Sequence, residues 1–249
     1  MKKLNQWMRR LAGQPPAPDG GQAMAALYSR FLGAGDLCFD IGANVGNRVR
    51  VFRQLGCRVV ALEPQESCFF ALAAQFSADP GVVLIQKAAA ADERDMEMRI
   101  ANVPTLSSLS PEWIGKVRAS GRFKDYQWDG RQTVRTTTLD ALIAAHGVPR
   151  FIKIDVEGFE PEVLRGLSRP VPYLSFEWTP ECSSATRDCL EQLGRIGTFE
   201  TNYSPEESME LASREWLDPA RLWDLLQPMA TDTRTFGDIY VRHPAPARG

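Results

Sequence analysis

Short apolar runs alternate with amphipathic stretches through the first third of the chain. The short runs predict strands, and the longer stretches with helical periodicity predict helices. The predicted order is helix 23–32, strand 37–41, helix 44–55, strand 58–62, helix 66–76 and strand 82–86. Such alternation predicts an α/β fold with a parallel, doubly wound sheet, which binds ligands at the carboxyl ends of its strands.

The alternation stops after residue 92 and returns near residue 139. Two candidate strands, 96–101 and 133–137, lie here beside a polar stretch with several aromatic residues, so we predict a cap or insertion over about residues 102–135. After it, the pattern predicts helices 139–146, 161–165 and 184–193, a helix begun by Asp218 and Pro219, and strands 150–154, 173–177, 199–203 and 237–242. We therefore expect residues 22–249 to form a single domain.

Residues 1–21 are expected to form a basic tail and a linker ahead of this domain. Apolar residues within residues 1–11 follow helical spacing among lysines and arginines, which is typical of a helix that binds a membrane surface. Because so short a segment binds bilayers weakly, we favour a helix on its own domain or no fixed structure. Weak peripheral membrane contact stays the alternative. Residues 14–21, with three prolines and two glycines, predict the linker.

Composition and charge exclude several classes of protein. The 249 residues carry 29 basic and 31 acidic side chains, so we predict no basic surface for nucleic acid. The five cysteines have no CxxC spacing, which indicates reduced thiols and neither a disulfide framework nor a zinc site. We see no apolar run long enough for a transmembrane segment or a signal peptide. We expect a cytoplasmic protein that acts on a small molecule.

The most informative motif is a glycine turn between the first predicted strand and the next helix. Residues 38–46 read CFDIGANVG, with Asp40 at the strand end and Gly42 and Gly46 in the turn. Glycine lets the backbone bend tightly and approach a ligand closely. Asn44 replaces the second glycine of the nicotinamide fingerprint G-x-G-x-x-G, which argues against a dehydrogenase. The turn predicts a nucleotide-type cofactor.

A second acid, Glu63, ends the next predicted strand about twenty residues after the turn. A carboxylate at this place can accept hydrogen bonds from both hydroxyls of a ribose. Pro64 follows directly and pushes Glu63 out of the helical region, so the acid is expected to stay extended at the strand tip. The pair predicts ribose binding.

A third group of charged residues follows the fourth predicted strand. In an extended strand, Lys153, Asp155 and Glu157 share one face. Buried charges require partners, so we expect Lys153 to contact a carboxylate. The candidates are Asp155, Asp40 and Glu177. An internal ion pair is the favoured role for Lys153, whereas Asp155 lies beside the expected cofactor, which favours a chemical role.

Together these motifs resemble those of the FkbM family of methyltransferases. The matching segments are Asp40 to Gly46, Glu63-Pro64, Thr138 to Asp140 and Ile152 to Glu160, and the resemblance covers about residues 36–180. It implies a class I methyltransferase (Rossmann-like) fold with a seven-stranded, mostly parallel sheet and helices on both faces. It also implies S-adenosyl-L-methionine as donor and, as acceptors, hydroxyls of sugars or of polyketide-type natural products.

The resemblance also implies roles for individual residues. Asp40, Gly42, Asn44 and Gly46 would surround the methionine part of the donor, and Glu63 would bind the ribose. Many class I enzymes place an aspartate after the third strand for the adenine amine, whereas residues 86–89 here read QKAA. We therefore expect adenine to be recognised by Gln86 or by backbone amides near Ala88.

Transfer to a hydroxyl requires an aligned acceptor and a group that removes its proton. The two histidines fall at predicted element ends away from the motifs, so we predict a carboxylate base among Asp155, Glu157 and Glu177. The same three acids could instead hold a divalent cation, for which magnesium suits better than zinc. The sequence leaves base and metal both open.

The acceptor is the least defined part of the prediction. Trp113, Tyr126 and Trp128 in the cap could offer flat faces to a sugar ring, although packing is their favoured role. Two other functions stay open: a donor-binding protein without catalysis, and an NAD-dependent oxidoreductase. The oligomeric state is not predicted.

Overall fold

A seven-stranded sheet forms the centre of the computed structural model, which describes residues 18–244. Its strands are β1 (Leu37–Ile41), β2 (Arg58–Leu62), β3 (Val82–Ile85), β7 (Phe151–Ile154), β8 (Tyr173–Trp178), β9 (Glu200–Pro205) and β10 (Gly237–Arg242). They lie in the order β3-β2-β1-β7-β8-β10-β9, and β10 pairs antiparallel with both of its neighbours. The seven strands predicted outside the cap are confirmed, with bounds shifted by at most two residues.

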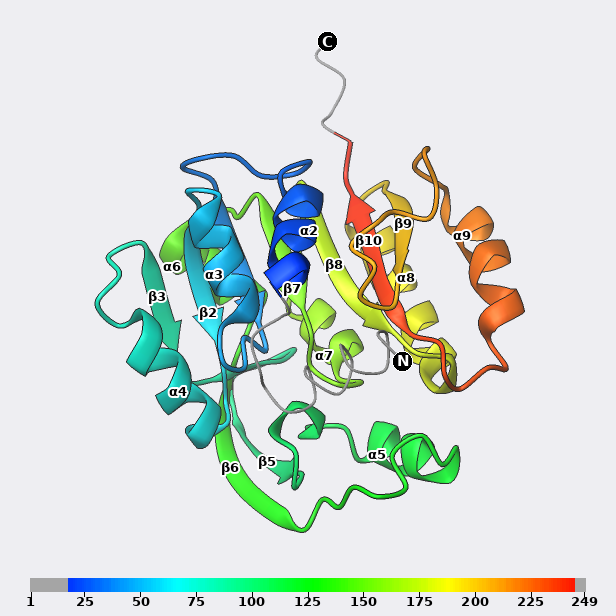
Figure 1. Ribbon diagram of the computed structural model, residues 1–249, viewed down its shortest axis with the longest axis horizontal. Coiled ribbons are helices and arrows are strands. Elements are labelled where there is room, and N and C mark those ends of the chain that lie inside the picture. Colours follow the sequence, from blue (N-terminus) through cyan, green and yellow to red (C-terminus); the bar gives the residue numbers. More distant parts are fainter. Residues whose placement is uncertain (1–17, 245–249) are drawn as a thin grey trace.

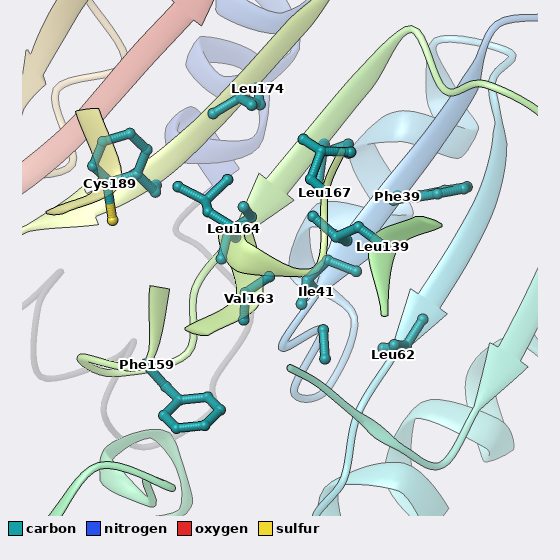
Figure 2. Close-up of a cluster of buried hydrophobic side chains, with 14 of the residues drawn as sticks. Phe39, Ile41, Leu62, Leu139, Phe159, Val163, Leu164, Leu167, Leu174 and Cys189 are labelled. Carbon is teal, nitrogen blue, oxygen red and sulfur yellow. The ribbon is translucent and has the colours of Figure 1, made fainter. Parts of the chain in front are cut away.

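Helices cover both faces of this sheet (Figure 1). One face carries α2 (Pro18–Tyr28), α3 (Asn47–Gln54) and α4 (Glu66–Phe76), which pack on alternate strand residues such as Cys38 and Val59. The other face carries α6 (Leu139–His146), α7 (Glu160–Arg165), α8 (Ser183–Ile196) and α9 (Pro219–Leu226), packed on Phe39 and Ile41 among others. Figure 2 shows part of this second core, where α7 side chains lie against β1.

Two helices begin elsewhere than the sequence predicts. Helix α2 begins at Pro18, five residues before the predicted start and inside the stretch predicted as a linker. Helix α3 begins at Asn47 rather than residue 44, because Gly46 has a left-handed backbone (φ 86°) that ends the turn there. The predicted start of α9 is confirmed, because Asp218 Oδ1 accepts the amide of Arg221 at 2.9 Å. Helix α6 is capped by Thr138, whose Oγ1 accepts the amide of Ala141 at 3.0 Å.

A small cap lies beyond the carboxyl ends of β1, β2 and β7, at the lower edge of Figure 1. It contains β4 (Ala88–Ala89), β5 (Asp95–Ile100), η1 (Pro104–Leu106), α5 (Pro111–Ala119) and β6 (Gly130–Thr137), and the strands form a second sheet in the order β4-β6-β5. The cap has its own apolar cluster, which includes Trp113, Val117, Phe123 and Trp128. The extra elements therefore begin at Ala88, earlier than predicted, and include a helix that the pattern did not reveal.

A buried ion pair joins this cap to the main domain. Arg122 Nε donates to Glu181 Oε1 at 2.7 Å, and each side chain is only 5% exposed. Glu181 lies in η2 (Pro180–Cys182), directly after β8. The same guanidinium donates to the carbonyl of Thr235, which precedes β10, at 2.7 Å. One arginine thus connects the cap to two loops at the carboxyl rim.

A further short helix, η3 (Gln227–Met229), follows α9.

The structure tests two other sequence predictions. All five cysteines are free and buried. Among residues 18–244, no helix combines the length and the apolar character that a membrane crossing requires. The amphipathic segment 1–11 and residues 14–17 of the predicted linker lie outside the described residues.

Candidate active site

Two adjoining cavities open at the carboxyl ends of β1, β2 and β7. We name them by one acid in each wall, the Glu63 cavity and the Asp40 cavity. Both are lined by the same five residues: Gly42, Asn44, Thr105, Asp155 and Glu157. Four of these five were predicted as site residues, so motifs more than a hundred positions apart in the sequence meet here.

The glycine turn brings β1 close to the end of β7. Gly42 has a φ of 82°, and a Cβ at this position would overlap the carbonyl oxygen of Asp155. Asn44 also has a left-handed backbone (φ 49°), and its Oδ1 accepts the amide of Val45 at 2.8 Å. Gly46 is not among the lining residues, and a Cβ there would overlap side chains of α4. The turn therefore has no room for a side chain at either glycine: one at Gly42 would push against the backbone of Asp155, and one at Gly46 would push against the core side chains of α4.

Glu63 is buried at the tip of β2, with 2% of its surface exposed. Its Oε2 accepts the amide of Asn44 and its Oε1 accepts the amide of Gln65, each at 2.8 Å. Burial raises the pKa of Glu63 to about 7, although both amides act to lower it. A carboxylate oxygen has two lone pairs, so each oxygen retains one acceptor position toward the cavity. This geometry suits a diol.

Asp40 is also buried, and it lines the second cavity. Its Oδ2 has no hydrogen-bond partner among the described residues. Burial raises the pKa of Asp40 to about 7, although the nearby cations Arg48 and Lys153 oppose the shift. A buried acceptor without a protein partner is a candidate for a hydrogen bond to water or to a ligand group.

Lys153 forms the ion pair that the sequence predicts, and a second one that it does not. Its Nζ lies 3.6 Å from Asp155 Oδ2 and 2.8 Å from Asp238 Oδ1, with the side chain fully buried. Burial acts to lower the pKa of Lys153, but the two carboxylates raise it above the ordinary value. Lys153 is therefore a permanent cation beneath Asp155.

Three predicted acids converge beside this lysine. Asp155, Glu157 and Glu177 each offer a carboxylate oxygen, and these oxygens all lie within 4.8 Å of one another. All three side chains are half-buried. Such a group of hard oxygen ligands can bind a divalent cation or share the removal of a proton.

Glu160 shapes the turn that carries this acidic group, a role that the sequence analysis missed. Its Oε1 accepts the amides of Val156 and Gly158 at 3.2 and 3.3 Å, on either side of Glu157. The backbones of Glu157 (φ 52°) and Gly158 (φ 84°) both adopt the left-handed conformation. Burial raises the pKa of Glu160 to about 7, and the Glu177 carboxylate adds to the shift. The motif E-G-x-E in the sequence was the available signal.

A strap formed by residues 104–109 closes one side of both cavities. At the Glu63 end, Gln65 Nε2 donates to the carbonyl of Pro104 at 2.9 Å. At the acidic end, Ser108 Oγ donates to the carbonyl of Glu157 at 2.7 Å. The strap thus connects the loop after β2 with the turn after β7. Nothing in the hydrophobic pattern pointed to Gln65 or Ser108.

The structure places the remaining candidates as follows. Ala88 lines the Glu63 cavity, whereas Gln86 is exposed and is not among the lining residues. Trp113 and Trp128 are buried in the cap cluster, and Tyr126 packs against it. The aromatic residues therefore take the packing role that the sequence analysis favoured.

The seven-stranded, mostly parallel sheet with helices on both faces, the glycine turn after β1 and the buried acid after β2 agree with the class I methyltransferase (Rossmann-like) fold that the sequence motifs imply. The Methyltransferase FkbM domain matches residues 40–184, more than half of the chain. The chain belongs to this family, which confirms the resemblance seen in the motifs.

The sequence identity to an individual curated relative is low. The hexuronic acid methyltransferase AglP of Haloferax volcanii is 27% identical over 143 residues, which are 57% of this chain and 54% of that protein. The chain thus spans about half the length of this curated relative.

The solved structures of similar fold cover most of the chain, but their sequence identities are low and their TM-scores lie below 0.5. The O-methyltransferase of Bacillus cereus in complex with SAH is 14% identical, with a TM-score of 0.48 over 97% of this chain and 89% of that one. A TehB-like SAM-dependent methyltransferase of Corynebacterium glutamicum is 10% identical, with a TM-score of 0.45 over 97% of both chains.

Proposed function

We propose that this chain transfers the methyl group of S-adenosyl-L-methionine to a hydroxyl of a sugar or natural-product-type small molecule. The observation that carries the proposal is the buried Glu63 carboxylate, which two backbone amides hold with one acceptor position free on each oxygen. Membership of the FkbM methyltransferase family supports the same reaction class. A sugar acceptor is supported by the relative whose name specifies a hexuronic acid.

The residues present fit this donor. Glu63 would accept hydrogen bonds from both ribose hydroxyls, and the carboxylate of Asp40 in the wall of the second cavity would attract the positively charged methionine part. Gly42 and Asn44 leave the backbone open toward the ligand, and Gly46 starts the helix behind them. When bound, the donor supplies a methyl group on a sulfonium, which a nucleophile can displace in line.

Asp155 is the proposed base for that displacement. It lines both cavities, so its carboxylate can reach an acceptor hydroxyl placed between them. The Nζ of Lys153 lies 3.6 Å from Asp155 Oδ2 and places a positive charge beside the carboxylate. Glu157 and Glu177 would hold the acceptor through hydrogen bonds from its other hydroxyls.

A divalent cation such as Mg²⁺ is the second candidate for the acidic group. The close approach of the oxygens of Asp155, Glu157 and Glu177 supports it. A cation there would lower the pKa of a bound hydroxyl and orient it. Activity that survives chelation and does not respond to added Mg²⁺ would favour the base alone.

Ligand-dependent melting tests the donor. A ligand at a hundred times its Kd adds about 2.7 kcal/mol, which raises Tm by roughly 5–10 °C in a domain of this size. We expect this shift with S-adenosylmethionine and S-adenosylhomocysteine, no shift with NAD, and loss of the shift in Glu63→Ala. A shift with NAD alone would favour the oxidoreductase.

Transfer of labelled methyl groups to a panel of sugars and glycosides tests catalysis. Asp155→Asn is expected to lower kcat at least a hundredfold, as for loss of a general base, while donor affinity stays near that of the unmodified protein. Binding without any transfer in the unmodified protein would favour a donor-binding protein instead. Full transfer by Asp155→Asn would remove Asp155 from the mechanism.

A further inference from the structure

The Glu63 cavity has one end that the proposed roles leave unused. The donor is a linear molecule in which the ribose separates the methionine part from the purine base. If Glu63 holds the ribose and the Asp40 cavity takes the methionine part, the base occupies the part of the Glu63 cavity away from Asp40. The residues that line the Glu63 cavity but not the Asp40 cavity include Pro64, Lys87, Ala88, Ala89, Met98 and Phe159.

The walls of this end are apolar and made partly of small residues. Ala88, Ala89, Met98 and Phe159 are buried, with 2–7% of each residue exposed. Ala88 and Ala89 leave room for a flat ring, and Pro64 and Phe159 offer flat or broad apolar surfaces. Such walls can hold any purine, because contact with its faces does not depend on the groups at its edge.

Apart from Glu63 itself, Lys87 is the only charged residue within residues 18–244 that lines the Glu63 cavity and not the Asp40 cavity. The acids that line the Glu63 cavity are Glu63, Asp155 and Glu157, which follow β2 and β7. The segment after β3 contributes Lys87 instead, and Gln86 beside it is exposed and does not line the cavity. A lysine ammonium donates hydrogen bonds and accepts none.

The present partner of Lys87 holds it weakly. Its Nζ lies 3.8 Å from Glu93 Oε1, and the two side chains are 36% and 59% exposed. Exposed pairs of this kind contribute little, so the ammonium can turn toward a ligand. Glu93 also accepts a hydrogen bond from Thr137 Oγ1 at 2.8 Å, which keeps its carboxylate at β6.

We propose that Lys87 recognises the purine base through the acceptor atoms of its edge, so that the site does not require an amine at position 6. This inference rests on the proposed use of an adenosyl donor. Adenine carries a hydrogen-bond donor at position 6, whereas hypoxanthine carries a carbonyl acceptor there. Both rings offer N7 to an ammonium, and hypoxanthine adds O6. The chain therefore binds 6-oxopurine analogues of the donor product nearly as well as the adenine form.

Affinities for two products test this specificity. S-adenosylhomocysteine and S-inosylhomocysteine are titrated by calorimetry into the full chain. A site that hydrogen-bonds the amine rejects the analogue that lacks it by orders of magnitude, whereas we expect a Kd ratio below about fivefold here. A ratio of fivefold or more in favour of adenine overturns the inference.

Charge reversal tests the role of Lys87 itself. Lys87→Asp supplies an acceptor for the amine, so the ratio is expected to rise at least about threefold in favour of adenine. Lys124→Met, an exposed cap lysine that does not line the cavity, is the matched control and should leave the ratio unchanged. A ratio in Lys87→Asp within threefold of the unmodified protein overturns the assignment to Lys87.

Failure of this inference is distinguishable from failure of the proposed function. If S-adenosylhomocysteine does not bind at all, the donor assignment is wrong and the inference falls with it. If S-adenosylhomocysteine binds and Glu63→Ala weakens both products, the donor site stands. A large adenine preference in that situation then overturns the Lys87 inference alone.

Discussion

Gly158 shows how closely one residue of the site is packed. It has a left-handed backbone (φ 84°), and a Cβ there would overlap the ring of Trp113 in the cap. A non-glycine residue in this region costs about 1–2 kcal/mol, and forced repacking costs about 1–3 kcal/mol more. Glycine at position 158 therefore allows both the turn that carries Glu157 and the close packing of Trp113 of the cap against this turn.

We expect Gly158→Ala to lower the free energy of unfolding by about 3 kcal/mol. Gly115→Ala is the matched control, because Gly115 is exposed in α5 and nothing lies within 4 Å of an added Cβ. That control should gain roughly 0.5–1 kcal/mol from helix propensity. Urea denaturation measures both, and equal effects of the two substitutions would contradict the packing argument.

The raised pKa of Asp40 makes the stability of the free protein depend on pH. A buried acid whose pKa rises from 3.8 to about 7 stabilises the fold fully below pH 3.8, and this contribution is lost as pH rises through 7. Asp40→Asn keeps the shape and removes the charge. We expect it to be more stable than the unmodified protein above pH 7 and to show a flatter pH dependence between pH 4 and 7.

Denaturation across that pH range measures this effect. Asp36→Asn is a suitable control, since Asp36 lies near β1 but outside both cavities and only accepts the amide of Gly33. An Asp40→Asn profile with the original slope would show that another group titrates.

Candidate site residues were predictable where the sequence signal lies in neighbouring positions of the chain. Asp40 and Glu63 were found because each ends a strand beside a glycine or a proline. Asp238 was not found, since it meets Lys153 across 85 positions of sequence and stands on the antiparallel strand. Gln65 was missed because its partner Pro104 belongs to the cap, whose course no pattern revealed.

At the level of elements, the seven strands were predictable because buried parallel strands are short apolar runs with turn residues between them. Helix α5 was not predicted, although Ser110 caps it by accepting the amide of Trp113 and Pro111 occupies its first turn. The aromatic and charged residues around α5 obscured its helical periodicity in the sequence. The apolar face of this helix packs on the cap cluster rather than on the main sheet.

The cap depends on the ion pair between Arg122 and Glu181. Removing one partner of a buried pair leaves an uncompensated charge, which costs about 3–5 kcal/mol. We expect Arg122→Ala to destabilise the protein by this order and to loosen the cap. Arg135→Ala, which breaks an exposed pair with Asp95, is the control and should change stability by less than about 1 kcal/mol.

Limited proteolysis together with thermal denaturation checks this prediction. Cleavage should begin within residues 101–130 in Arg122→Ala and not in Arg135→Ala. Equal resistance of the two variants would mean that the apolar cluster of the cap holds it without the ion pair.

At the scale of the whole molecule, the strap joins the two ends of the site. Gln65→Met removes the bond to Pro104, which is worth about 1 kcal/mol, so we expect donor affinity to fall roughly fivefold. Hydrogen exchange at Leu106 and Ser107 should accelerate in the same variant. Gln54→Met, exposed on α3, is the control. Unchanged exchange in Gln65→Met would show that the strap is held from the Ser108 end alone.

Thr105 lines both the Glu63 cavity and the Asp40 cavity. Thr105 is thus one of the side chains that border both the part of the site proposed for the ribose and base of the donor and the part proposed for its methionine end. Enlarging one part at this position reshapes the other. A lineage that makes room for a bulkier acceptor by changing Thr105 would therefore also change the walls of both parts of the proposed donor site.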